Sequence, residues 1–155
     1  MGGSVIGPGG LGIPRAMETR HDQDRCGGQD RHPRTLLVVD DQASARHLVA
    51  HALRHCCRVL EAGDRRSAIE LLVREPVDLV LLDLHLPPAP ASPSEGLSVH
   101  RFIREHEPGL PVVVVSGNED PAVRQALLGS GARAFLAKPV AAEKLVAIVQ
   151  QLLGC

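Results

Sequence analysis

The segment VDLVLLDLHLP, residues 77–87, carries an unbroken aliphatic run that stops at an aspartate, Asp83. Short, continuous, β-branched runs are typical of strands that are buried on both faces of a parallel sheet. We therefore expect a central strand that ends at Asp83. Four similar runs occur elsewhere in the chain, at Leu36–Val39, Cys57–Ala62, Pro111–Val115 and Ala134–Ala137.

Helical periodicity fills the intervals between these runs and follows the last one. Asp64 stands where a side chain can cap the second of these helices. Five strands that alternate with five helices predict an α/β fold, a doubly wound parallel sheet with helices on both faces. In such sheets function gathers at the carboxyl ends of the strands. The predicted helices are Ala43–His55, Arg65–Arg74, Leu97–Glu107, Asp120–Ser130 and Ala141–Leu153.

Residues 1–34 differ from the rest of the chain. They are rich in glycine, proline and polar residues and show no sustained apolar periodicity. Such a segment buries too little apolar surface to offset its ordering entropy, so we expect a disordered tail before one domain at residues 35–153. Whether translation starts at Met1 or at Met17 is left open by the sequence.

Composition excludes several classes of function. Seventeen Lys and Arg against eighteen Asp and Glu give a net charge of −1, and the chain has no Trp or Tyr. We therefore expect no binding to nucleic acid and none to membranes. No secretory signal or membrane-length apolar run is present. The four cysteines, at positions 26, 56, 57 and 155, form a poor disulfide framework and a poor zinc pattern, which suits a cytoplasmic protein.

Charged and hydroxyl side chains follow the predicted strands. Three carboxylates at one edge of a sheet repel one another unless a cation joins them, and Mg²⁺ suits a site with few oxygen ligands. A metal, a lysine and a hydroxyl around one carboxylate can neutralise the charge of a transferring phosphoryl group. The sequence thus predicts a phosphoryl-transfer site made by Asp40, Asp41, Asp83, Ser116 and Lys138.

Four segments in this order resemble the receiver domain of two-component response regulators. They are VVDD (38–41), LVLLDLHLP (79–87), VVVSG (113–117) and GARAFLAKP (131–139). The resemblance implies a flavodoxin-like sheet with strand order 2-1-3-4-5.

The resemblance also implies roles for the acidic residues. Asp83 is similar to the aspartate that accepts a phosphoryl group from a kinase histidine. Asp41 resembles the direct Mg²⁺ ligand, and Asp40 the ligand that acts partly through water. Asp83 itself and the backbone carbonyl of His85 would complete the metal site.

Further roles follow from the same resemblance. Ser116 and Lys138 are similar to the residues that bind the phosphoryl oxygens, and Phe135 to the aromatic side chain that switches rotamer on activation. We expect Phe135, which has no hydroxyl, to favour the inward position. His85 and Asn118 occupy places that modulate dephosphorylation, although either could be an ordinary loop residue. A cis Lys138–Pro139 bond is frequent in such proteins.

The resemblance implies a stand-alone switch, which undergoes only self-phosphotransfer and slow autodephosphorylation. Its expected partners are a sensor histidine kinase or a histidine phosphotransfer protein, and a downstream protein that binds the face formed by roughly residues 119–150. Two rival interpretations remain: a degenerate receiver that binds partners without phosphorylation, and a Mg²⁺-dependent phosphatase with an aspartyl-phosphate intermediate.

Three local features carry separate expectations. The proline-rich stretch 87–95 is longer than the usual spacing in receivers and should be extended, exposed and placed over the rim of the site. His47, His51 and His55 share one helix face and either bind zinc or, as we favour, form a solvated face. Of the adjacent Cys56 and Cys57, we expect one in the core and the other as a free thiol.

Overall fold

The computed structural model describes residues 32–117 and 120–155. The predicted disordered tail falls almost entirely outside these residues, as do the two possible start methionines. The strands are β1 (Thr35–Val39), β2 (Arg58–Ala62), β3 (Leu79–Leu82), β4 (Val112–Ser116) and β5 (Ala134–Ala137). The helices are α3 (Ala43–Leu53), α4 (Arg65–Arg74), α5 (Ser94–His106), α6 (Pro121–Gly129) and α7 (Ala142–Leu153).

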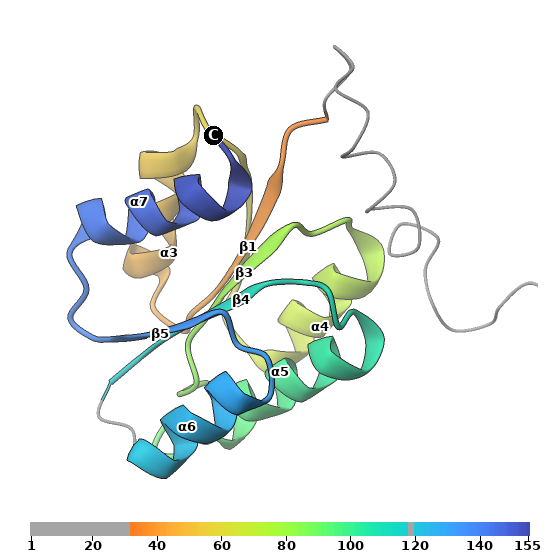
Figure 1. Cartoon of the computed structure of the whole chain (residues 1–155), viewed down its shortest axis with the longest axis vertical. Coiled ribbons are helices and arrows are strands. Elements are labelled where there is room, and N and C mark those ends of the chain that lie inside the picture. The colour runs from red at the N-terminus through yellow and green to blue at the C-terminus, as the bar shows by residue number, and fades with distance from the viewer. Residues whose placement is uncertain (1–31, 118–119) are drawn as a thin grey trace, which may run out of the picture.

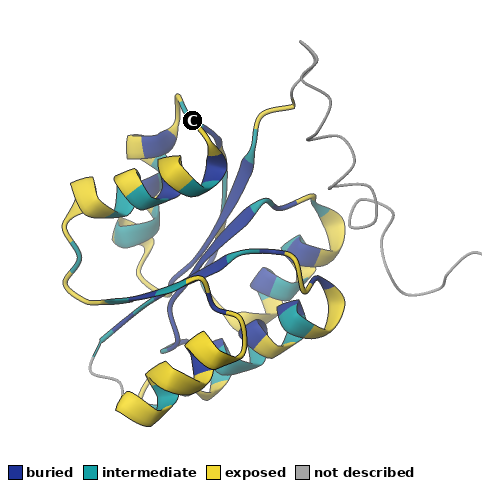
Figure 2. Ribbon diagram, in the orientation of Figure 1, coloured by how far each residue is buried: buried dark blue, intermediate teal, exposed yellow. Residues whose placement is uncertain are grey.

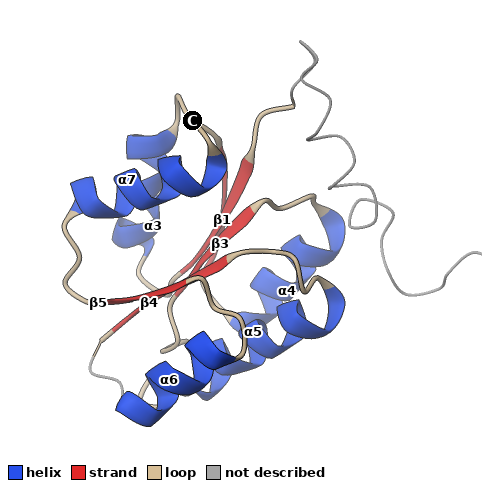
Figure 3. Cartoon of the chain, viewed as in Figure 1, coloured by secondary structure: helices blue, strands red, loops and turns tan. Residues whose placement is uncertain are grey.

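The five strands form one parallel sheet in the order β2-β1-β3-β4-β5, so the predicted fold class and strand order are confirmed. Helices α3 and α7 cover one face of this sheet, and α4, α5 and α6 cover the other (Figure 1). Figure 3 shows the strands as a single layer between the two helical layers. Because every strand is parallel, all five carboxyl ends lie at the same edge.

The core consists of two apolar layers, one on each face of the sheet, as Figure 2 shows for the buried strands. Alternate residues of β1 point into different layers, since side chains alternate along a strand. Leu37 and Val39 pack in the layer beneath α4, α5 and α6. Leu36 and Val38 pack in the layer beneath α3 and α7. This packing fixes the register of β1 and hence the position of the residues that follow it.

Helix boundaries agree with the sequence except at the start of α5. Asp64 caps α4 as predicted, since its side chain accepts a hydrogen bond from the backbone of Ser67. Helix α5 starts at Ser94, three residues before the predicted Leu97. The earlier start includes Glu95, whose charge is favourable in a first turn, and Gly96, whose helix propensity is low.

The proline-rich segment before α5 is a series of turns and is not extended as predicted. The backbone of Ala89 donates to the carbonyl of Leu86 at 3.2 Å, and that of Ser92 donates to the carbonyl of Ala89 at 3.0 Å. Both donors are residues without a proline ring, so turns form between the prolines. Much of the segment is exposed, and residues 87–93 are not helical, as expected, but Ser94 and Glu95 belong to α5, against the prediction.

The cysteines differ from the prediction. Cys57 is buried in the core as a free thiol, but Cys56 is joined to Cys155 in a disulfide. The sequence places these two residues 99 positions apart. They meet because α3 and α7 run side by side on one face of the sheet, which no local pattern reveals.

The three histidines on α3 and just after it do not form a metal cluster among the described residues. His51 and His55 contact Arg54, and His47 lies 3.6 Å from a carboxylate oxygen of Glu61. In the described part of the chain, no helix has both the length and the apolar character needed to span a membrane. The backbone has cis bonds at Pro87–Pro88 and at Lys138–Pro139, the latter as the resemblance implied.

Candidate functional site

Three aspartates meet at the carboxyl edge of the sheet. Asp40 and Asp41 follow β1, Asp83 follows β3, and one carboxylate oxygen from each lies within 4.8 Å of the others. Asp40 and Asp83 are only 8% and 5% exposed, whereas Asp41 faces solvent. The site is therefore a small acidic pocket with one wet side.

Backbone hydrogen bonds orient the two buried carboxylates. Oδ1 of Asp40 accepts from the backbone N–H of Gln42 at 2.9 Å. Oδ1 of Asp83 accepts in the same way from His85 at 3.0 Å. Each aspartate thus turns its other oxygen, Oδ2, toward the centre of the site.

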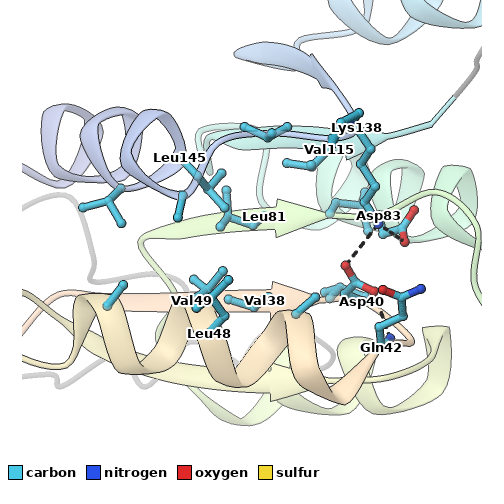
Figure 4. A pocket seen from close by; sticks show the side chains of 18 residues that line it. Val38, Asp40, Gln42, Leu48, Val49, Leu81, Asp83, Val115, Lys138 and Leu145 are labelled. Carbon is cyan, nitrogen blue, oxygen red and sulfur yellow. Dashed lines mark hydrogen bonds and ion pairs between the residues drawn. The ribbon is translucent and has the colours of Figure 1, made fainter.

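Lys138 joins these two oxygens. Its Nζ lies 2.9 Å from Oδ2 of Asp83 and 3.2 Å from Oδ2 of Asp40 (Figure 4). Burial lowers the pKa of Lys138, but the hydrogen bonds and charges of Asp83 and Asp40 together raise it above the ordinary value. The ammonium therefore stays charged and neutralises part of the acidic pocket.

Repulsion persists around Asp41. Burial raises the pKa of its carboxyl group, a hydrogen bond to Asp40 and the charges of Asp40 and Asp83 raise it further, and only Lys138 opposes them. Three carboxylates and one ammonium leave a net charge of −2 if all are ionised. A divalent cation would cancel that charge, and oxygen ligands with solvent on one side suit Mg²⁺. The residues present therefore fit a Mg²⁺ ion.

Three further residues were predicted to belong to the site: Ser116, Phe135 and Asn118. Ser116 is fully buried at the end of β4, and its carbonyl accepts a hydrogen bond from the backbone of Lys138 at 2.8 Å. Phe135 is buried in β5 with its ring inward, and the guanidinium carbon of Arg124 lies 5.4 Å from the ring centroid. Asn118 lies outside the described residues.

His85 is held by the proline-rich segment. Its Nδ1 donates to the carbonyl oxygen of Pro90 at 2.9 Å, since a carbonyl can only accept. The segment thus folds back on the residue two positions after Asp83. Its contact with His85 was not foreseen, because no sequence pattern links a histidine ring to a particular loop carbonyl.

Arg46 was also missed by the sequence analysis. Nη1 of Arg46 donates to the backbone carbonyl of Asp40 at 2.6 Å, and its Nε lies 3.4 Å from a carboxylate oxygen of Glu61. Arg46 therefore braces the loop that carries the acidic pair. Gly96 packs against the backbone that follows Asp83.

An apolar cavity of about 460 Å³ lies next to the acidic pocket. It is bounded by the sheet and by the facing sides of α3 and α7, as the close-up shows (Figure 4). Several of the side chains that these helices present to it are small, among them Ala45, Ala52 and Ala142. The two helices therefore leave space between them, which extends from the site along α3 as far as Ala52.

A doubly wound sheet of this order, with three aspartates and a lysine at its carboxyl edge, defines a receiver-type signalling domain. A family model described as "Response regulator receiver domain" matches residues 36–150. The chain therefore belongs to the response regulator receiver domain family. Domains of this family generally serve in two-component signalling without enzymatic activity of their own, and they generally bind Mg²⁺ at a cluster of aspartates.

Curated relatives include a transcriptional regulatory protein and a sensor kinase. The chain is 35% identical over 125 residues to a "Probable transcriptional regulatory protein TcrX" of Mycobacterium tuberculosis, a match that covers 80% of this chain and 51% of that protein. It is 32% identical over 115 residues to the "CAI-1 autoinducer sensor kinase/phosphatase CqsS" of Vibrio cholerae, covering 72% of this chain and 16% of that protein. The chain spans about half the length of the first of these relatives and a smaller part of the second.

A solved structure gives the same answer for the fold. The signal receiver domain of a putative LuxO repressor protein from Vibrio parahaemolyticus is 25% identical, with a TM-score of 0.71. The match covers 80% of this chain and 92% of that one.

Proposed function

We propose that this receiver domain accepts a phosphoryl group on Asp83. The observation that carries the proposal is the pairing of Asp83 with Lys138. Asp83 is the most buried of the three aspartates, its Oδ1 is fixed by the backbone of His85, and its Oδ2 faces the Lys138 ammonium. A carboxylate so oriented is placed to act as a nucleophile, and the ammonium can neutralise negative charge that arrives with the phosphoryl group.

The donor we propose is a phosphohistidine of a sensor kinase or of a histidine phosphotransfer protein. A carboxylate oxygen of Asp83 attacks phosphorus, the P–N bond breaks, and its electron pair returns to the imidazole ring. A bound Mg²⁺ would supply positive charge to the phosphoryl oxygens. Asp40, Asp41 and Asp83, with the carbonyl of His85 as the resemblance implied, are the groups we propose to hold it.

Lys138 and Ser116 are the donors that we expect to respond to the phosphoryl group. An aspartyl phosphate adds negative charge and acceptor oxygens where Lys138 now bonds two carboxylates. Movement of Ser116 toward the phosphoryl group would alter the packing of β4 against β5, where Phe135 is buried. With the ring already inward, we propose that the unphosphorylated protein is biased toward the active arrangement.

The surface for the downstream partner that we propose lies on α6, β5 and α7, within residues 119–150. It carries a hollow of about 290 Å³ whose lining includes Arg124, Phe135 and Lys144. Two cations around a buried aromatic ring favour a partner with acidic and apolar side chains. We place this exchange of partners in the cytoplasm, where kinase domains of two-component systems act, and propose no contact with nucleic acid by this domain itself.

Phosphotransfer from purified sensor kinases tests the proposal. Each kinase of the source organism is first labelled on its histidine, and the label is then followed onto the full 155-residue chain with and without Mg²⁺. Rapid, Mg²⁺-dependent transfer from one kinase is the expected result. Transfer from none of them, together with tight binding of a partner by the unlabelled chain, would instead support the degenerate receiver. Continuous release of phosphate from a chromogenic ester would support the phosphatase.

A further inference from the structure

Helices α3 and α7 are neighbours on one face of the sheet, and both start beside the acidic site. Helix α3 begins two residues after Asp41, and α7 begins four residues after Lys138. Their far ends pack together through Leu53 and Leu153 in the same apolar cluster. The 460 Å³ cavity lies between the two helices and is lined by Ala45–Ala52 of α3 and by Ala142–Val146 of α7. The first half of α7 therefore borders the cavity, whereas its last turn packs in the apolar cluster.

Two backbone turns bring a pair of cysteines together at these far ends. Helix α7 ends at Gly154, whose φ of 75° is left-handed, and the N–H groups of Gly154 and Cys155 both donate to the carbonyl of Gln150. This turn directs Cys155 back toward α3. At the end of α3, the N–H of Cys56 donates to the carbonyl of Leu53 at 2.9 Å.

The resulting Cα–Cα separation of Cys56 and Cys155 is 5.7 Å, inside the range that a disulfide requires. Because each cysteine is placed by its own helix cap, their proximity does not depend on the bond between them. We propose that Cys56 and Cys155 are a reversible redox site that fastens the C-terminal helix of the receiver to α3 when oxidised. This site is separate from the phosphoacceptor function proposed above.

The chemistry of the exchange is balanced with a low-molecular-weight disulfide as oxidant. The thiolate of exposed Cys155 attacks one sulfur of that disulfide and releases one thiolate. Cys56, which is half-buried, then attacks the mixed disulfide and releases the second thiolate. The protein loses two protons and two electrons, and the oxidant becomes two thiols. The reverse reaction restores both cysteines.

Cys57 is adjacent in sequence but excluded from the exchange. It is buried in the core layer beneath α3 and α7, where no oxidant reaches its sulfur. Burial also raises the pKa of the Cys57 thiol, which reduces the thiolate available for attack. The geometry therefore selects Cys56 over its neighbour.

Fastening the two helices has a specific physical consequence. The bond closes a loop across 99 residues, which contains every strand of the sheet except β1, so it restricts the unfolded chain strongly. It also holds the last turn of α7 over Leu53. Reduction leaves α7 attached by the apolar contacts alone, next to a cavity that these contacts do not fill. The end of α7 should then open more often.

The experiment uses the full chain with Cys26→Ser, which removes the remaining thiol that could compete for a partner. The protein is equilibrated with mixtures of oxidised and reduced glutathione, alkylated, and digested without reduction. We expect a peptide that joins Cys56 to Cys155, with Cys57 alkylated only after unfolding. Hydrogen exchange of α7 should slow on oxidation, and Tm should rise by about 10 °C or more.

Matched variants separate the effect of the Cys56–Cys155 disulfide from general destabilisation. Cys155→Ser should show the faster α7 exchange of the reduced protein in every glutathione mixture, whereas Cys57→Ala should keep the redox response. Gly154→Ala should form the bond less readily, since an L side chain is strained at its φ although the space around it is open. A dithiol that persists in oxidised glutathione, or a bond that forms without slowing α7 exchange, would overturn the proposal.

Discussion

Gly96 and Leu84 are in direct backbone contact: the N–H of Gly96 donates to the carbonyl of Leu84 at 3.1 Å. A Cβ on Gly96 would lie 2.7 Å from the carbonyl oxygens of both Asp83 and Leu84, nearer than real Cβ atoms approach. Helix α5 can therefore begin against the acceptor loop only if residue 96 has no side chain. The close packing of α5 against the loop after Asp83 thus requires glycine at position 96, and this packing holds the proposed nucleophile in place.

Gly96→Ala should destabilise the domain by about 3 kcal/mol, the upper range for forced overpacking, and should lower the rate of phosphorylation by displacing Asp83. Gly129→Ala is the matched control, because its Cβ would meet nothing and alanine favours a helix, so its stability should rise by a few tenths of a kcal/mol. Urea unfolding of both variants measures the difference. Equal stability of the two variants would show that α5 can shift away from Leu84 without cost.

Lys138→Ala should destabilise the metal-free protein by about 2 kcal/mol, because it leaves the buried carboxylates of Asp40 and Asp83 facing each other without a cation. Mg²⁺ should recover most of the loss, and phosphorylation should persist at a reduced rate without the conformational response. Lys144→Ala, an exposed change on α7, serves as the control. It should neither destabilise the metal-free protein nor alter phosphorylation. The measurement is thermal unfolding in chelator and in Mg²⁺. A deficit that Mg²⁺ fails to reduce would contradict the proposed metal site.

Deletion of residues 88–92 should change the lifetime of the aspartyl phosphate, because it removes the Pro90 carbonyl that holds the ring of His85. His85→Ala should change the lifetime in the same direction, and the two changes together should not add. The decay of the phosphorylated species after donor removal gives the lifetime. If the deletion leaves both uptake and decay of phosphate unaltered, the segment is a neutral insertion, which its small cost in loop entropy would permit.

His100 should make stability fall below about pH 6.5. Burial lowers the pKa of His100, the charge of Arg104 lowers it further, and the hydrogen bond with Ser130 opposes this. Oγ of Ser130 donates to the carbonyl of Leu127, so it accepts from Nε2 of His100, and buried Nδ1 has no partner among the described residues. Protonation of Nδ1 would bury an unpaired charge.

The sign follows from the lowered folded pKa. The unfolded chain binds the proton first, so the full contribution of His100 is present above its ordinary pKa of 6.5 and is lost as pH falls through the folded value. Chemical unfolding between pH 7.5 and 5 should therefore show a steeper loss in the wild type than in His100→Gln. His106→Gln on the exposed side of α5 should keep the wild-type slope. A wild-type slope in His100→Gln would assign the acid sensitivity to other groups.

The sequence predicted the fold and the edge at which the site lies, because parallel strands bring their carboxyl ends together whatever the details of packing. It could place Asp40, Asp83 and Lys138 at one edge but could not show that Lys138 bonds both carboxylates. Individual contacts between residues that are distant in the chain could not be predicted from the sequence. The contact of His85 with Pro90 and the meeting of Cys56 with Cys155 depend on how loops and helix ends fold, and neither leaves a periodic pattern in the chain.

Asp83→Asn should have two opposing effects on the stability of the metal-free protein. Removing one of three like charges should stabilise the metal-free protein. The variant also weakens the 2.9 Å interaction with Lys138, however, so the two effects oppose each other. We expect Asp83→Asn to keep the fold and to have a free energy of unfolding close to that of the wild type.

The most direct test of the central claim identifies the residue that carries the phosphoryl group. The chain is incubated with acetyl phosphate and Mg²⁺, the acyl phosphate is reduced with borohydride to homoserine, and peptides are sequenced by mass spectrometry. The account predicts homoserine at position 83, and no modification in folded Asp83→Asn. Homoserine at position 40 or 41 instead would contradict it. Incorporation of phosphate into Asp83→Asn at the wild-type rate would also contradict it.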